Sequence, residues 1–213
     1  MISSKNINTK VFFENAKNSL RLTEEREDLL LEIADTISDE YFDREKVNIN
    51  FICTHNSRRS QFAQVWSYFA ANYFELSNFS TFSGGTEATA FHRNTVRALQ
   101  YAGFEFNVED FSHQNPKYLI SFRGSKSPLS AFSKTFENPI NEFPYIAITT
   151  CDSADEKCPF IPDATHRFHL PYSDPKSSDS KDNTKETYIA TSKQIAGEVY
   201  FIFEEIKRQI SEN

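Results

Sequence analysis

"VNINFIC" at residues 47–53, followed by "THNSRRSQFAQVW" at residues 54–66, is the stretch that decides the fold. Its first part alternates and then becomes continuously apolar, which is typical of a strand buried in a parallel sheet. Apolar residues then recur every three or four positions from Phe62 to Tyr73, which predicts a helix. The stretch is therefore a strand, a short loop and a helix, the repeating unit of an α/β fold.

The rest of the chain continues the alternation of strands and helices. Strands that alternate with helices imply a parallel twisted sheet flanked by helices, in which ligands bind at the carboxyl ends of the strands. Residues 118–136 predict two short strands about a Gly-Ser-Lys turn, and residues 174–185 are a polar loop. We expect further strands at 79–85, 145–151 and 166–172, and further helices at 94–104 and 186–210.

Composition excludes several classes of protein. The 213 residues carry a net charge of -7, which argues against non-specific binding to nucleic acid. No uninterrupted apolar run is long enough to span a membrane, and the N-terminus lacks the features of a signal peptide. We therefore expect a cytoplasmic protein without nucleic-acid or membrane partners.

The N-terminal part has helical patterns of its own. Thr23 is a plausible N-cap, acidic residues follow it, and apolar residues recur at helical spacing from Leu29 to Ile37. We expect a helical N-terminal extension at 1–46 that packs on a catalytic domain at 47–213.

The loop after the first strand has the properties of an oxyanion site. Successive backbone N–H groups and the dipole of the following helix can form a cradle for an anion. Arg59 adds a planar fork suited to two oxygens of a tetrahedral oxyanion, and Ser60 can donate a hydrogen bond to the Cys53 sulfur. A thiolate is favoured at such a helix N-terminus, so Cys53 is the expected nucleophile. The expected oxyanion-binding residues are Thr54, His55, Asn56, Ser57, Arg58, Arg59 and Ser60.

This loop resembles the active-site loop of the low-molecular-weight protein tyrosine phosphatase family, which usually reads C-x-G-N-x-C-R-S. Cys53, Asn56, Arg59 and Ser60 match that pattern, and "FSGGTEATAFHRNTVRALQYAGF" at 82–104 resembles the family's second strand and helix. The chain departs from the pattern at His55, which replaces a glycine, and at Arg58, which replaces a cysteine. Arg58 either adds positive charge near the site or points outward into solvent.

A second motif bears on the reaction. The chain has only three cysteines, which argues against a structural disulfide framework. "CDSADEKCP" at 151–159 resembles the redox segment of thioredoxin-coupled arsenate reductases, a branch with the same fold. The resemblance implies a relay: Cys53 attacks arsenate, Cys151 attacks Cys53 and releases arsenite, and Cys158 attacks Cys151. A thioredoxin-like reductant then reduces the Cys151–Cys158 disulfide.

Asp174 precedes Pro175, and the resemblance implies that its carboxyl is the general acid. Hydrolysis of phosphotyrosine or a small phosphate ester needs only Cys53, Arg59 and Asp174, so a phosphatase is the first alternative. A non-catalytic oxyanion-binding regulatory protein is the second. No cofactor is expected. The histidines have no spacing typical of a metal site; they are His55, His92, His113, His166 and His169.

Overall fold

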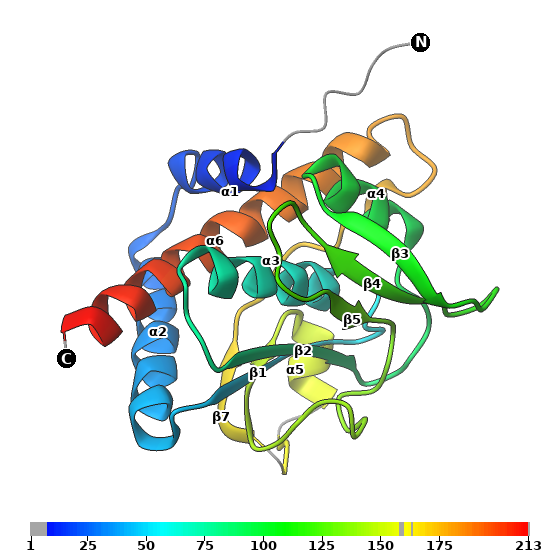
Figure 1. The fold of residues 1–213 in the computed structure, drawn as a ribbon. Coiled ribbons are helices and arrows are strands. Elements are labelled where there is room, and N and C mark those ends of the chain that lie inside the picture. Colours follow the sequence, from blue (N-terminus) through cyan, green and yellow to red (C-terminus); the bar gives the residue numbers. More distant parts are fainter. Residues whose placement is uncertain (1–7, 158–159, 163, 213) are drawn as a thin grey trace.

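A computed structural model describes residues 8–157, 160–162 and 164–212. Its central sheet has four parallel strands in the order β2-β1-β6-β7, with helices on both faces (Figure 1). The prediction of a parallel sheet flanked by helices is confirmed. The strands are β1 (Val47–Cys53), β2 (Phe79–Gly85), β6 (Tyr145–Thr149) and β7 (Ala164–His169).

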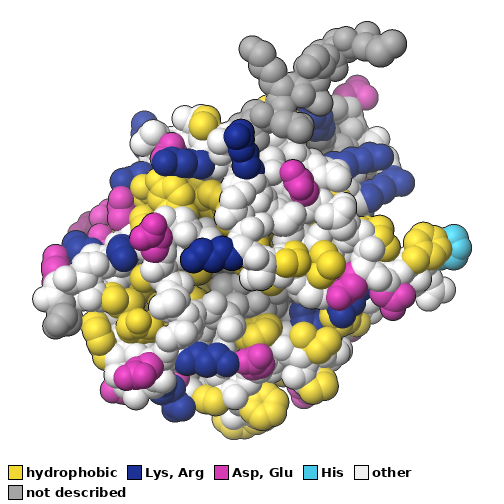
Figure 2. All heavy atoms as spheres, in the orientation of Figure 1, with side chains coloured by type: hydrophobic (Ala, Val, Ile, Leu, Met, Phe, Trp, Pro, Cys, Tyr) yellow, Lys and Arg dark blue, Asp and Glu magenta, His cyan; other side chains and the backbone are white. Residues whose placement is uncertain are grey.

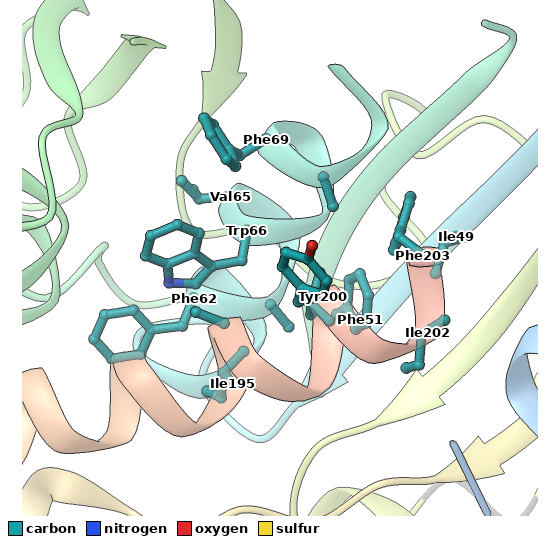
Figure 3. Packing of buried hydrophobic residues seen from close by; sticks show 14 of the residues in the cluster. Ile49, Phe51, Phe62, Val65, Trp66, Phe69, Ile195, Tyr200, Ile202 and Phe203 are labelled. Carbon is teal, nitrogen blue, oxygen red and sulfur yellow. The ribbon is translucent and has the colours of Figure 1, made fainter. Parts of the chain in front are cut away.

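The main core lies between one face of this sheet and the helices that cover it. Trp66 on α3 (Arg59–Tyr73) is fully buried among apolar side chains of its own helix, of β1 and of α6 (Thr184–Glu212), as Figure 3 shows. Its indole nitrogen donates a hydrogen bond to the Ser192 hydroxyl at 3.0 Å, so the buried polar group is satisfied. This packing holds α3 against the sheet and thereby places the helix that begins at Arg59.

The N-terminal helices α1 (Thr9–Asn18) and α2 (Glu24–Arg44) share this core. The rings of Phe12 and Phe13 stack on Trp66, and α1 lies along α6 (Figure 1). The predicted N-cap is confirmed, because the Thr23 side chain accepts a hydrogen bond from the Arg26 backbone. The division at residue 46 into an extension and a catalytic domain stays a prediction.

A smaller cluster covers the opposite face of the sheet. It includes Cys53, Cys151, and Ala154 of the short helix α5 (Asp152–Lys157). The polar sequence "DSADEK" forms this short helix. Both cysteines are buried in this cluster, at the carboxyl ends of neighbouring strands.

Between α4 (Arg93–Tyr101) and β6, the chain forms a second, antiparallel sheet in the order β3-β4-β5. The prediction of two short strands within 118–136 is confirmed, but β3 has no counterpart in the sequence analysis. Most of the side chains of β3 are exposed, so the strand has no apolar period to detect. The strands are β3 (Glu105–Asp110), β4 (Lys117–Ser121) and β5 (Leu129–Ala131).

The face drawn in Figure 2 mixes acidic, basic and apolar side chains without a continuous basic area. Within the described residues, no helix has both the length and the apolar character needed to cross a membrane.

Candidate active site

The loop between β1 and α3 has its carbonyl groups turned outward. The Thr86 hydroxyl donates to the Thr54 carbonyl, the Ser133 hydroxyl donates to the His55 carbonyl, and the His92 N–H donates to the Ser57 carbonyl. In a trans peptide the N–H of the next residue points away from the carbonyl. The N–H groups that follow these three carbonyls therefore face the inside of the loop, as an anion cradle requires.

Asn56 organises the loop from within. It is fully buried and has a φ of 45°, a left-handed conformation that asparagine tolerates better than most residues. Its side-chain oxygen accepts hydrogen bonds from the Lys134 backbone N–H at 2.9 Å and from the Gln61 amide at 3.1 Å. Its side-chain nitrogen donates to the Ser60 hydroxyl at 2.9 Å. One side chain thus connects the loop, the first turn of α3 and a segment 78 residues away.

The Ser60 hydroxyl lies 3.1 Å from the Cys53 sulfur. Because the Asn56 amide already donates to the Ser60 oxygen, the hydroxyl proton of Ser60 is left to point at the sulfur. A hydrogen bond donated to sulfur suits a thiolate, which is the nucleophilic form of cysteine. This geometry agrees with the role that the sequence analysis expected for Ser60.

Two glycines let the loop lie close to its neighbours. A methyl group on Gly85 would lie 2.8 Å from the Asn56 backbone nitrogen, and one on Gly84 would lie 2.3 Å from the Phe136 Cα. These atoms belong to the backbone and cannot yield to a side chain. The pair at the end of β2 is therefore needed for the loop to close against the sheet.

Arg59 reaches across the site to the segment after β7. Its Nη1 donates to the Tyr172 carbonyl at 3.1 Å, and its Nη2 donates to Asp174 Oδ2 at 2.7 Å. Its Nε is buried and has no hydrogen-bond partner among the described residues. A buried donor without a partner is costly, and an oxyanion bound in the loop would satisfy it.

The two departures from the family pattern have different surroundings. The Arg58 side chain is only 11% exposed and donates to the Tyr188 hydroxyl at 2.7 Å and to Asp179 Oδ2 at 3.0 Å. The outward, solvated orientation of Arg58 is therefore wrong, and both acceptors of its guanidinium lie outside the loop. His55 is 42% exposed and faces Glu87. The positive φ lies at Asn56, so His55 meets no backbone strain there.

Cys151 follows β6 and lies beside the loop. The Thr54 hydroxyl is 3.5 Å from the Cys151 sulfur, and the Thr150 N–H donates to the Ile52 carbonyl at 2.7 Å. The residues after the two strands are thus in contact. Cys158 lies outside the described residues, and its role stays a prediction. The Ser57 hydroxyl donates to the Ala90 carbonyl, so its side chain supports the loop from outside.

Several residues at the site had no signal in the sequence analysis. Lys134 is 3% exposed, and burial lowers the pKa of its amine to about 8. Gln61 is fully buried in α3, as are the polar residues Gln64 and Ser67, and polar residues on a buried helix were the local signal available. Tyr188 and Asp179 come from α6 and from the polar loop before it, and no local pattern connects them to the site.

Burial and the charge of Arg58 lower the pKa of His92 below its ordinary value, so this histidine is neutral at pH 7. His92 stacks on the Tyr188 ring and caps the N-terminus of α4, which is a structural role. The Nδ1 atom of His169 lies 3.3 Å from Asp155 Oδ1 and 3.0 Å from the Thr149 hydroxyl. Asp155 also pairs with Arg167 and its side chain is 27% exposed, whereas that of Asp152 is 80% exposed.

No family model matches the chain. An arsenate reductase of Brevibacillus brevis is 32% identical over 131 residues, which are 61% of this chain and 78% of that protein. An arsenate reductase of Bacillus licheniformis is 28% identical over 153 residues, 72% of this chain and 91% of that protein. A solved low-molecular-weight protein tyrosine phosphatase from T. tengcongensis superposes with a TM-score of 0.51 at 15% identity, over 75% of this chain and 99% of that one. The likeness to this phosphatase shows the fold.

Proposed function

Because the chain belongs to the low-molecular-weight protein tyrosine phosphatase superfamily, in its arsenate reductase branch, we propose that it reduces arsenate to arsenite. The observation that carries this proposal is the placement of Cys53 and Cys151. The two thiols lie in one buried cluster at the ends of adjacent parallel strands, and the Thr54 hydroxyl contacts the Cys151 sulfur. A phosphatase reaction has no use for a second thiol at this position.

In the first step, the loop N–H groups and the Arg59 fork bind arsenate. The Cys53 thiolate attacks arsenic, and an arsenate oxygen leaves as water after protonation. We assign this proton to the Asp174 carboxyl, whose oxygen lies 2.7 Å from the Arg59 Nη2 that binds the oxyanion. Protonation of the leaving oxygen is ordinary general acid catalysis.

In the second step, the Cys151 thiolate attacks the Cys53 sulfur. An S–S bond forms, the As–S bond breaks, and its electron pair stays on arsenic, which leaves as arsenite. Cys158 then attacks the Cys151 sulfur and releases Cys53 as a thiolate. A thioredoxin-like dithiol reduces the resulting Cys151–Cys158 disulfide and is itself oxidised to a disulfide.

The first test measures arsenate-dependent oxidation of thioredoxin by the wild type, Cys151→Ser and Cys158→Ser. Of these three proteins, we expect only the wild type to turn over. Mass spectrometry after arsenate treatment is expected to find a Cys53–Cys151 disulfide in Cys158→Ser. Thr150→Ser, which keeps the hydroxyl beside the site, is the matched control and is expected to turn over normally. Turnover that survives the loss of Cys151 would refute the relay.

Hydrolysis of phosphate monoesters is the second candidate, favoured by the contact between Arg59 and Asp174. It requires Cys53 but neither of the other cysteines. Hydrolysis of p-nitrophenyl phosphate is therefore expected to survive in Cys151→Ser. If this hydrolysis is efficient and arsenate turnover is absent from the wild type, the phosphatase proposal replaces the reductase proposal.

A further inference from the structure

Asp174 and Asp179 stand at the two ends of a single turn of 3-10 helix, η1 (Pro175–Ser178). The Asp174 side chain caps the start of this turn by accepting from the Lys176 N–H at 3.0 Å. The Asp179 N–H closes the end of the turn by donating to the Lys176 carbonyl. The position of Asp179 therefore determines where Asp174 lies.

Consecutive arginines at the start of α3 hold the two ends of this turn. Arg59 pairs with Asp174, and Arg58 pairs with Asp179. The second end is held more firmly, because the Tyr188 hydroxyl also donates to Asp179 Oδ1 at 2.7 Å. Both side chains of the Arg58–Asp179 pair are largely shielded from water, with 11% and 27% exposure.

The two ion pairs differ in what a bound oxyanion does to them. An oxyanion in the loop competes with Asp174 for the Arg59 fork, which is the group suited to two of its oxygens. Arg58 donates from Nε to the Tyr188 hydroxyl and from Nη2 to Asp179, and neither acceptor belongs to the loop. Binding of substrate thus weakens one restraint on η1 and leaves the other intact.

We propose that Arg58 is a positioning residue whose ion pair with Asp179 keeps Asp174 over the site after an oxyanion has displaced Asp174 from Arg59. The role assigned to Asp174 rests on the proposed function. Arg58 can form this ion pair with Asp179, whereas the cysteine that the family usually has at this position could not. It links the backbone of the anion loop to the far end of the acid-bearing turn.

The charges at Asp179 agree with this role. Burial works to raise the pKa of Asp179, but the hydrogen bond from Tyr188 and the charge of Arg58 outweigh it and hold the pKa below its ordinary value. Asp179 is therefore ionised at neutral pH, as the ion pair requires. Asn94 donates a further hydrogen bond to Asp179 at 3.3 Å from α4.

The first experiment measures hydrogen exchange of the backbone amides at 176–179, with and without saturating inorganic phosphate. In the wild type, we expect phosphate to leave their protection unchanged within about twofold. In Arg58→Met, phosphate is expected to lower the protection about tenfold or more, as the loss of a charged hydrogen bond implies. Arg93→Met is the matched control. Arg93 is exposed on α4, and this substitution also removes one positive charge near His92.

Equal protection of Arg58→Met and wild type in phosphate would overturn the proposal. If Arg58→Met does not fold, Tyr188→Phe asks the same question, because it removes the hydroxyl that donates to Asp179 and keeps the ring. This exchange experiment needs no turnover. A wild type that keeps its protection in phosphate but fails to reduce arsenate would therefore refute the proposed function and leave the positioning role standing.

The second experiment compares kinetics on p-nitrophenyl phosphate and on an alkyl phosphate, whose poorer leaving group depends more on an acid. We expect Arg58→Met to lower kcat for the alkyl phosphate about 10- to 100-fold while KM changes less than about threefold. Arg58→Lys, which keeps the charge, is expected to restore part of kcat. A rise in KM alone would show that Arg58 binds substrate and would contradict the proposal.

Discussion

Replacing Asn56 by alanine tests whether this one side chain holds the oxyanion loop together. Asn56 is fully buried, and its amide group makes hydrogen bonds to Ser60 and Gln61 in the first turn of α3 and to the distant Lys134. We expect Asn56→Ala to destabilise the protein and to abolish oxyanion binding. The loop would lose the restraint that directs the Ser60 proton at Cys53.

The size of the effect follows from which partners are left without a substitute. Gln61 keeps the Asn56 and Phe132 backbone carbonyls as acceptors, and Ser60 keeps the Cys53 sulfur. The backbone N–H of Lys134 loses its acceptor, the Asn56 side-chain oxygen. A buried N–H without a hydrogen-bond partner costs roughly 1–3 kcal/mol. A left-handed alanine adds about 1 kcal/mol. The free energy of unfolding is therefore expected to fall by roughly 2–4 kcal/mol.

Urea unfolding of the wild type and the variant measures this loss directly. Asn56→Gly is the matched control, because it removes the same hydrogen bonds but accepts a φ of 45° without strain. We expect the glycine variant to be at least as stable as the alanine variant, the reverse of the usual order. A loss below about 1 kcal/mol for Asn56→Ala would refute the reasoning about the buried N–H. An alanine variant clearly more stable than the glycine variant would refute the reasoning about the backbone.

Three further predictions follow from the packing around the site and the core. Gly85→Ala would place a methyl group 2.8 Å from the Asn56 backbone nitrogen, so we expect a loss of about 2 kcal/mol or more in urea unfolding together with loss of phosphate binding; normal phosphate binding would contradict this. Burial lowers the pKa of Lys134 from 10.5 to about 8. Below pH 8 the charged amine therefore lowers the free energy of unfolding, and this loss of stability disappears as pH rises toward 10.5. Lys134→Met is therefore expected to stabilise the protein by up to roughly 3 kcal/mol at neutral pH, and a gain that does not shrink between about pH 8 and 10 would count against the assignment. Arg26 pairs at 2.7 Å with Glu198, which is 2% exposed, so Arg26→Met is expected to cost roughly 3–5 kcal/mol by leaving a buried carboxylate unpaired. The double variant with Glu198→Met should recover most of that loss; if it does not, the pair itself is not the cause.

Local sequence patterns were sufficient for the elements that build the site. The strand over 47–53, the loop and the helix after it depend on apolar periods and on residues close together in the chain. The same holds for the N-cap at Thr23. Such patterns reflect burial on one face of an element, which is a local property of the chain.

The sequence predicted that the strands are parallel, but their order, β2-β1-β6-β7, came from the structure. From that order it follows that the ends of β1 and β6 meet. The strand β3 was out of reach because its side chains are mostly exposed and have no apolar period.

By itself, the sequence determined that a cysteine and an arginine share an anion loop between a buried strand and a helix. Only the tertiary structure decided what surrounds that loop: that Asn56 is held by the Lys134 backbone, and that Arg58 turns to Tyr188 and Asp179. These contacts join residues 78 to 130 positions apart, and a hydrogen bond over such a separation leaves no period or spacing in the chain. It exists because the packing of the sheet and its helices brings the partners together.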